Sequence, residues 1–289
     1  MSSTDSATAP VALHLAVGSG TDVGLRRKVN EDSLLAQHPV YIVADGMGGH
    51  EAGDKASQAV VLELSGLVGK DAVTPNELAD SLDRAHAAVR VIAEGTSRGA
   101  GSTLTGVVIS DQGGRPHWLV FNIGDSRVYL LRSGDFVQLT VDHSIAQEMI
   151  DDGTLAREDL ATYAGRNVIT KAVGADHSDA DFWLYPIVTG DRLVLCSDGL
   201  SGEVTDEGIA AHLVANLDPQ AAADALVADA LAHGGRDNVT VLVIDAIAGG
   251  ISVDIEEATI AAEARPAEID DMLEDTTIEL PRRGGRGVV

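Results

Sequence analysis

Cysteine, basic residues and long hydrophobic runs are all scarce in this sequence, and each scarcity excludes a class of protein. Cys196 is the only cysteine among 289 residues. The chain therefore cannot form an internal disulfide, and nothing indicates an oxidising compartment. Because Cys196 ends the apolar run 193–196, we predict a buried, unreactive thiol.

Basic residues are outnumbered: 20 lysines and arginines face 45 aspartates and glutamates, which gives a formal net charge of -25. Non-specific nucleic-acid binding and docking on an anionic membrane both require clustered Lys and Arg, so the composition argues against both. An acidic chain suits the binding of divalent cations instead.

No segment approaches the ~18 consecutive apolar residues of a membrane span. Residues 1–10 are small and polar, without the basic and apolar regions of a secretion signal. We therefore expect a disordered leader over 1–10 and a cytoplasmic protein with no membrane span, acting as a monomer.

The length and the 45% hydrophobic content allow one substantial core, which we assign to a single domain over residues 11–248. Between residues 251 and 289 the sequence carries ten acidic residues and four arginines, without any periodicity. We predict that 249–289 is an acidic disordered tail ending in a short basic cluster.

The hydrophobic pattern predicts helices over 51–67 and 75–93, the second capped by Thr74 with Pro75 in its first turn. Short β-rich runs follow, which we interpret as one antiparallel meander, and two further runs as a strand pair joined by a tight turn. The runs of the meander are 102–110, 117–123, 127–132 and 135–139, and the later pair is 182–188 with 192–196.

Further strands are expected at 11–17 and 238–244, and further helices at 145–155, 206–215 and 219–232. The stretch 156–166 has no hydrophobic periodicity. Together with the preceding helix, we interpret it as a surface flap over about residues 145–168. Because strands come in runs rather than alternating with helices, the pattern favours an α+β fold with large antiparallel sheets.

Four aspartates share one kind of position, at the end or the start of a strand-like run. Asp45, Asp125 and Asp198 follow such runs, and Asp237 precedes one. Antiparallel neighbours bring the end of one strand beside the start of the next, so the four carboxylates can converge on one rim of a sheet. Each aspartate alone is a common turn residue; the joint pattern is what indicates a site.

Such a cluster of like charges is unfavourable without cations. Carboxylate and carbonyl oxygens favour Mg²⁺ or Mn²⁺, and no Cys/His spacing indicates zinc. Two such ions roughly 3.5 to 4 Å apart can acidify a bridging water and polarise a phosphoryl oxygen. Arg27, close to Asn30-Glu31-Asp32, can supply a bidentate contact to the phosphate.

Several separated motifs resemble those of one family, the metal-dependent Ser/Thr protein phosphatases of type 2C in their bacterial form. In the family's order, over about residues 12–245, they are Arg27-x-x-Asn30-Glu31-Asp32, Asp45-Gly46-Met47-Gly48-Gly49-His50, Gly124-Asp125-Ser126-Arg127, Ser197-Asp198-Gly199-Leu200 and Gly235-Arg236-Asp237-Asn238-Val239-Thr240. The fold that this resemblance implies is a sandwich of two antiparallel β-sheets flanked by helices on both faces, a four-layer αββα arrangement.

The resemblance also implies roles. Asp45 would bridge two Mn²⁺ or Mg²⁺ ions, with the Gly46 carbonyl on one ion and two further aspartates on the other. The remaining residues implied in the site are Asp198 and Asp237 as those further ligands, Glu31 and Asp32 holding metal-bound waters, Asp125 with Asp198 in a third, weaker metal site, and Arg27 on the substrate phosphate.

The implied reaction is a one-step attack of the metal-bridging water on phosphoserine or phosphothreonine in proteins, opposing bacterial Ser/Thr kinases. Met47 stands where animal members usually have a histidine proposed as general acid, which leaves the proton donor open between His50, His143 and a water. Two other functions stay open: a catalytically silent relative that binds partners, and a phosphatase dedicated to one regulatory protein.

Overall fold

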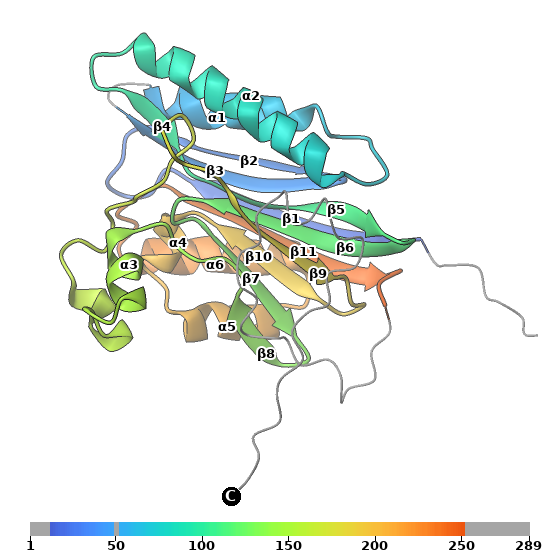
Figure 1. Ribbon diagram of the computed structural model, residues 1–289. Helices are drawn as coiled ribbons and strands as arrows, with labels where there is room; N and C mark the ends of the chain where they lie inside the picture. The colour runs from blue at the N-terminus through green and yellow to red at the C-terminus, as the bar shows by residue number, and fades with distance from the viewer. Residues whose placement is uncertain (1–11, 49–51, 252–289) are drawn as a thin grey trace, which may run out of the picture.

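Two antiparallel sheets stack face to face in the computed structural model, which describes residues 12–48 and 52–251 (Figure 1). The first sheet has the strand order β1-β11-β10-β7-β8, and the second has the order β2-β3-β5-β6-β9 with the short β4 paired to β3. The strands of the first sheet are β1 (His14–Asp22), β11 (Val239–Ala248), β10 (Arg192–Cys196), β7 (Arg127–Arg132) and β8 (Asp135–Gln138). Those of the second are β2 (Asp32–Gln37), β3 (Val40–Gly48), β4 (Ala100–Ser102), β5 (Leu104–Gln112), β6 (Arg115–Ile123) and β9 (Asp181–Pro186).

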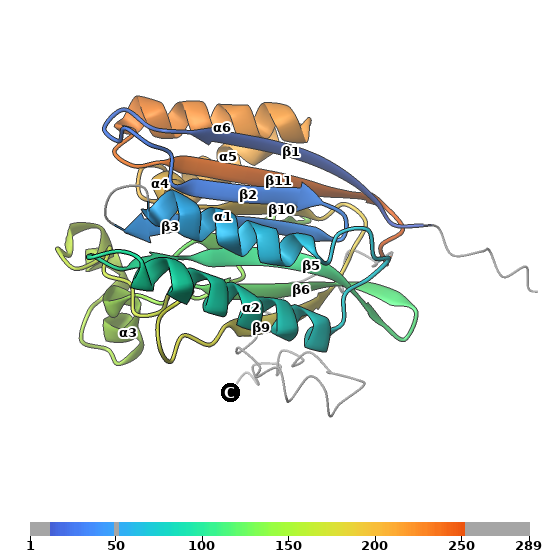
Figure 2. The same cartoon turned by 90° about the horizontal axis from the view of Figure 1, so that it is seen from above.

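Helices cover the outer face of each sheet, as the view from above shows (Figure 2). α1 (Ala52–Ser65) and α2 (Pro75–Glu94) pack on the second sheet, and α4 (Asp198–Ser201), α5 (Asp206–Ala215) and α6 (Pro219–His233) pack on the first. The expected α+β sandwich with helices on both faces is therefore confirmed. The Thr74 cap is also present, because the Thr74 hydroxyl accepts from Glu77 N and the Glu77 carboxylate accepts from Thr74 N.

Alternation along β3 explains why its sequence is a continuous apolar run. Val40, Ile42 and Ala44 face the helices α1 and α2, whereas Tyr41 and Val43 face the core between the two sheets. A strand that is buried on both faces needs apolar residues at every position. The same alternation places Asp45, the residue after Ala44, on the face of β3 that carries Tyr41 and Val43.

The predicted pairing of the two strands near 182–196 is wrong. β9 pairs with β6 in the second sheet, whereas β10 lies between β7 and β11 in the first, so the connection between β9 and β10 crosses from one sheet to the other. Asp191 holds this crossing: its carboxylate accepts hydrogen bonds from Arg132, from Trp118 Nε1 and from Val188 N. The connection itself is a tight turn, in which Asp191 N donates to Val188 O at 3.0 Å.

The predicted single meander likewise divides between the sheets. β5 and β6 form a hairpin in the second sheet, β7 and β8 form one in the first, and residues 124–126 cross between them. The first strand begins at His14 rather than at 11, and β2 is a strand that the hydrophobic pattern did not predict. β2 was missed because only Leu34, Leu35 and Ala36 in it are apolar.

The flap consists of α3 (Ile145–Asp151) followed by the 3-10 helix η1 (Arg157–Thr162). Within the described residues, the longest helices are too short or too polar to cross a membrane. The predicted leader over 1–10 and nearly all of the tail over 249–289 lie outside the residues that the structure describes.

Candidate metal centre

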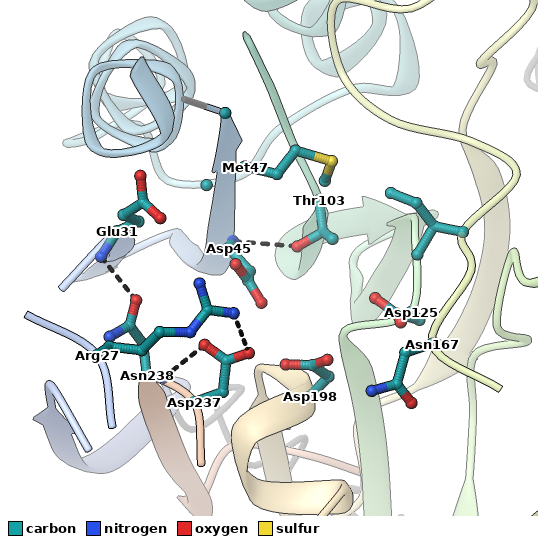
Figure 3. A pocket seen from close by; sticks show the side chains of 13 residues that line it. Arg27, Glu31, Asp45, Met47, Thr103, Asp125, Asn167, Asp198, Asp237 and Asn238 are labelled. Atoms are coloured by element: carbon teal, nitrogen blue, oxygen red, sulfur yellow. Dashed lines mark hydrogen bonds and ion pairs between the residues drawn. The ribbon is translucent and has the colours of Figure 1, made fainter. Parts of the chain in front are cut away.

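A cleft of about 290 Å³ opens at one end of the sandwich, at the rim where β3 and β10 end and β11 begins (Figure 3). Its lining includes all four aspartates that follow or precede strands, together with Arg27 and Glu31. The complete lining is Arg27, Glu31, Asp45, Gly46, Met47, Gly48, Thr103, Asp125, Asn167, Ile169, Asp198, Asp237 and Asn238. The predicted convergence of the carboxylates on one rim is therefore present in the fold.

Strand geometry brings these acids together. Asp45 follows Tyr41 and Val43 on the face of β3 that points between the sheets, because side chains alternate along a strand. Asp198 begins α4 directly after β10, and Asp237 stands just before β11, the strand beside β10. Asp125 lies in the crossing between β6 and β7, and so approaches the cleft from the other side.

Burial and mutual repulsion disfavour ionisation of Asp45, Asp125 and Asp198. Burial is the largest cause in every case: it raises the pKa of Asp125 to about 8 and that of Asp198 to about 6, with neighbouring carboxylates adding to both shifts. The pKa of Asp45 lies well above its ordinary value, through burial and then through the charges of Asp32, Asp198 and two further aspartates. A bound cation would remove much of this repulsion.

Two carboxylate oxygens in this cluster are buried and have no hydrogen-bond partner, namely Oδ1 of Asp32 and Oδ1 of Asp198. Native structures rarely leave such atoms unsatisfied, so each one needs an explanation. A hard divalent cation is a suitable partner, because Mg²⁺ and Mn²⁺ prefer carboxylate, carbonyl and water oxygens. The residues present therefore fit such ions.

Within 12–48 and 52–251, no three His, Cys, Asp or Glu side chains are grouped as a ready-made metal site.

Gly46 lines the cleft at a position where no residue with a side chain would fit. A Cβ atom at this position would lie 2.0 Å from the Gly53 carbonyl oxygen and 2.6 Å from the carbonyl oxygen of Glu31. Gly46 N donates to that Glu31 oxygen at 3.1 Å. Only glycine allows β3, the start of α1 and the Glu31 segment to approach this closely.

Asp32 differs from the other predicted site residues, because it does not line the cleft. It pairs with Asp45 across β2 and β3, and its Oδ2 accepts a hydrogen bond from Ser197 Oγ at 2.8 Å. Burial, the largest cause, raises its pKa to about 7. Asp32 is thus buried beside Asp45, with one carboxylate oxygen held by Ser197 and the other without a partner.

Arg27 reaches over the cleft from the segment between β1 and β2. Its Nη2 lies 2.5 Å from Asp237 Oδ2, and about half of its side chain is exposed. The neighbouring Asp237, Asp45 and Glu31 raise its pKa against the opposing effect of burial. A guanidinium with free N–H groups at the mouth of an acidic cleft can bind the oxygens of a phosphate.

The opposite wall comes from β5 and the flap. Thr103 Oγ1 accepts from Asp45 N at 3.0 Å and lies 2.7 Å from the buried Ser126 hydroxyl, which fixes the end of β3 (Figure 3). Asn167 and Ile169, at the end of the flap, complete the lining. No sequence pattern indicated Asn167, because the flap has no hydrophobic periodicity.

No histidine lines the cleft within the described part of the chain. His143 is buried, accepts from Gly124 N through its Nδ1 at 3.1 Å, and has Nε2 3.1 Å from Asp181 Oδ2. It therefore braces the Gly124–Asp125 crossing rather than facing a substrate. The other candidate proton donor, His50, lies outside the described residues.

Comparisons with known proteins agree with this geometry. A family model described as protein phosphatase 2C matches residues 25–234. The serine/threonine protein phosphatase PstP of Mycobacterium tuberculosis is 36% identical over 269 residues, which cover 87% of this chain and 51% of the relative. The serine/threonine phosphatase stp of Listeria welshimeri is 33% identical over 239 residues, which cover 78% of this chain and 93% of the relative.

Among solved structures, the catalytic domain of PstP in complex with two manganese ions superposes with a TM-score of 0.72 at 34% identity. The match covers 81% of this chain and 98% of that domain. The chain spans about half the length of the mycobacterial relative.

Proposed function

The chain belongs to the protein phosphatase 2C family, and we propose that it is a metal-dependent phosphatase that hydrolyses phosphoserine and phosphothreonine in proteins. The observation that carries this proposal is the cleft itself. Buried carboxyls with raised pKa values and two unpartnered oxygens stand opposite an exposed arginine, in a fold shared with Ser/Thr phosphatases.

We propose two Mn²⁺ or Mg²⁺ ions as cofactors. Asp45, Asp198, Asp237 and the Gly46 carbonyl would hold them, Glu31 and Asp32 would hold metal-bound waters, and Asp125 with Asp198 would hold a third, weaker ion. When bound, such ions activate water and neutralise phosphoryl charge. The unpartnered Asp198 oxygen and the manganese complex of the related catalytic domain support this assignment.

The protein's own contribution is positioning and charge. Arg27 would hold two phosphate oxygens with parallel N–H donors, which turns the reacting phosphorus toward the acids below. The segment that carries Arg27 and the flap end at Asn167 form two sides of the entrance, so a protein side chain must enter between them. With no histidine in the described lining, we propose that a water gives the proton to the leaving hydroxyl.

Phosphoproteins are the proposed substrates, in line with the Ser/Thr phosphatase relatives, and Ser/Thr kinases are the proposed opposing partners. We further propose that the protein works in the cytoplasm as a monomer. The acidic net charge of -25 supports partners other than nucleic acid.

The test is release of phosphate from a phosphothreonine peptide with added Mn²⁺, comparing the wild type with Asp198→Asn. We expect the variant to lose activity by on the order of 100-fold or more, and excess chelator to stop the wild type. Asp135→Asn, in the exposed turn between β7 and β8, is the matched control and keeps full activity.

Unchanged hydrolysis in chelator, or in Asp198→Asn, would overturn the assignment. Absence of any wild-type turnover, together with tight binding of phosphopeptide, would favour the catalytically silent relative instead. Turnover of one protein substrate but of no member of a phosphopeptide library would identify the dedicated phosphatase.

A further inference from the structure

Asn238 is the most heavily engaged carboxamide beside the cleft. Its side chain makes three hydrogen bonds, all to main-chain atoms that lie more than two hundred residues earlier in the chain. Its Oδ1 accepts from Glu31 N at 2.9 Å (Figure 3). Its Nδ2 donates to Val23 O at 3.0 Å and to Val29 O at 2.9 Å. Only 3% of Asn238 is exposed, so these bonds are shielded from competing water.

The three main-chain partners of the Asn238 side chain belong to one loop. Val23 and Val29 mark the two ends of the segment that contains Arg27, and Glu31 follows it. One carboxamide therefore closes this loop, residues 23–31, much as a side chain closes a turn. The loop is anchored at its start as well: Leu25 N donates to Gly235 O at 2.7 Å.

The middle of the loop has little else to hold it. Residues 25–29 are all exposed, Leu25 by 65% and Val29 by 48%. The Arg27 side chain donates a hydrogen bond to Asp237, which stands next to Asn238. The position of the Arg27 main chain thus depends on hydrogen bonds at the loop ends. Asn238 supplies three of them and is the one side chain in the described part of the chain that binds both ends. Others join Gly24 N to Asp22 Oδ1, Leu25 N to Gly235 O, Asn30 Nδ2 to Thr21 Oγ1, and Glu31 O to Gly46 N and Ser57 Oγ.

We propose that Asn238 is a positioning residue for phosphate binding, acting through loop 23–31 on Arg27. This inference rests on the proposed phosphatase function and names the residue that preorganises its phosphate contact. A displacement of about 1 Å in a positioning group can lower activity by on the order of 100-fold. Deleting the Asn238 carboxamide is expected to permit such a displacement.

Asn238 also adjoins Asp237, a proposed metal ligand, so action through the metal site must be distinguished from action through the loop. Asp237 Oδ1 accepts from the main-chain N of Asn238 at 2.8 Å, a bond that side-chain substitution leaves in place. Asn238→Ala should therefore spare metal affinity. An effect through Asp237 would weaken Mn²⁺ binding, and an effect through the loop would not.

The first experiment reads the loop without using activity. Arg26, Arg27 and Lys28 are exposed trypsin sites inside the loop, and cleavage there requires local opening. In limited trypsin digestion followed by mass spectrometry, Asn238→Ala should be cut at 26–28 at least about tenfold faster than the wild type.

The matched control is Asn122→Ala on the other side of the cleft. Asn122 is fully buried, and its Nδ2 donates to the carbonyl oxygens of Gly124 at 2.9 Å and Val141 at 3.1 Å. Removing it deletes a comparable carboxamide without touching loop 23–31. Cleavage at 26–28 should stay at the wild-type rate in this variant.

The second experiment is a double-mutant cycle with Arg27→Ala, measured as kcat/KM on a phosphothreonine peptide. Asn238→Ala alone should lower kcat/KM on the order of 100-fold, mostly through KM. In the Arg27→Ala background the same change should lower it less than about threefold, because the group being positioned is gone. Mn²⁺ affinity, measured by calorimetry, should stay within about threefold of the wild type.

Three results would each overturn the proposal: additive effects in the double-mutant cycle, unchanged cleavage at 26–28, or a parallel loss of Mn²⁺ affinity. Should Asn238→Ala fail to fold, Asn238→Asp keeps the size and the acceptor for Glu31 N but loses both donors, and must show the same faster cleavage. If the wild type releases no phosphate, the phosphatase assignment fails on its own, while the digestion still decides whether Asn238 holds the loop.

Discussion

Asp125 offers a direct test of the electrostatics of the cleft. Its carboxyl lies in the crossing between β6 and β7, and burial, followed by the charges of Asp198 and Asp142, raises its pKa to about 8. The pKa of Asp32 is raised to about 7, again mainly by burial. In protein freed of metal by chelator, these carboxyls hold protons near neutral pH that an unfolded chain would have released.

The sign of the pH dependence of stability follows from this difference in bound protons between the folded and unfolded states. Where the folded state binds more protons than the unfolded state, the free energy of unfolding falls as pH rises. The fall spans the interval from the ordinary carboxyl pKa near 4 up to the folded value near 8. Histidines, whose ordinary pKa is about 6.5, titrate in the lower part of the window pH 6.5–8, so slopes are compared between variants that keep the same histidines.

The magnitude is about 1.4 kcal/mol per pH unit for each proton retained, and therefore about 2 kcal/mol per retained proton across this window. For a chain of this size, about 2 kcal/mol corresponds to a fall of roughly 4 to 8 °C in Tm. Asp125→Asn removes one of the titrating carboxyls, so we expect a visibly shallower slope. Asp135→Asn, exposed in the turn between β7 and β8, should keep the wild-type slope.

Tm would be measured by calorimetry in chelator at several pH values, and then with Mn²⁺. Because cations bind the deprotonated carboxylates, stabilisation by Mn²⁺ should grow with pH and oppose the fall. A wild-type Tm that is flat or rising between pH 6.5 and 8 in chelator would refute the reasoning. So would an Asp125→Asn slope equal to that of the wild type.

Three further predictions concern other parts of the fold. Asp191→Asn weakens the buried pair with Arg132 and should lower the free energy of unfolding in urea by about 3 kcal/mol; a loss below about 1 kcal/mol would show that the pair is dispensable. Burial raises the pKa of Cys196 to about 12, so a thiol reagent at pH 8 should label it only on unfolding, and rapid labelling of folded protein would contradict this. Gly46→Ala places a methyl group 2.0 Å from Gly53 O, so calorimetry should show weaker Mn²⁺ binding and a lower Tm, and unchanged values would mean that the main chain can yield there.

Local signals were sufficient for the parts of the fold that local interactions decide. The helix α2 was predicted to within one residue, because Thr74, Pro75 and Glu77 form a complete start signal. The cleft acids could be found because each stands at the end or start of an apolar strand, and the antiparallel order of the sheets then brings them to one rim.

Other features depend on which faces meet, and the sequence carries little information about that. β10 is apolar at nearly every position and β9 at most, so hydrophobic alternation does not assign either strand to a sheet. Proximity in sequence suggested that they pair, and the Asp191 network shows why they do not. Asn238 was visible only as part of a motif, since its partners lie more than two hundred residues away.

The distribution of hydrogen bonds within the acidic cluster distinguishes a reactive site from a structural one. Asp237 is satisfied by Arg27 and by the Asn238 main chain, and one oxygen of Asp32 is satisfied by Ser197. A cluster that served only to fix the fold would be expected to satisfy its buried oxygens in the same way, because an unpaired one costs about 1–3 kcal/mol or more. Oδ1 of Asp198 and Oδ1 of Asp32 are left without partners. In the cleft, the fold thus tolerates an unfavourable arrangement that a divalent cation would relieve, and this supports the proposed metal chemistry.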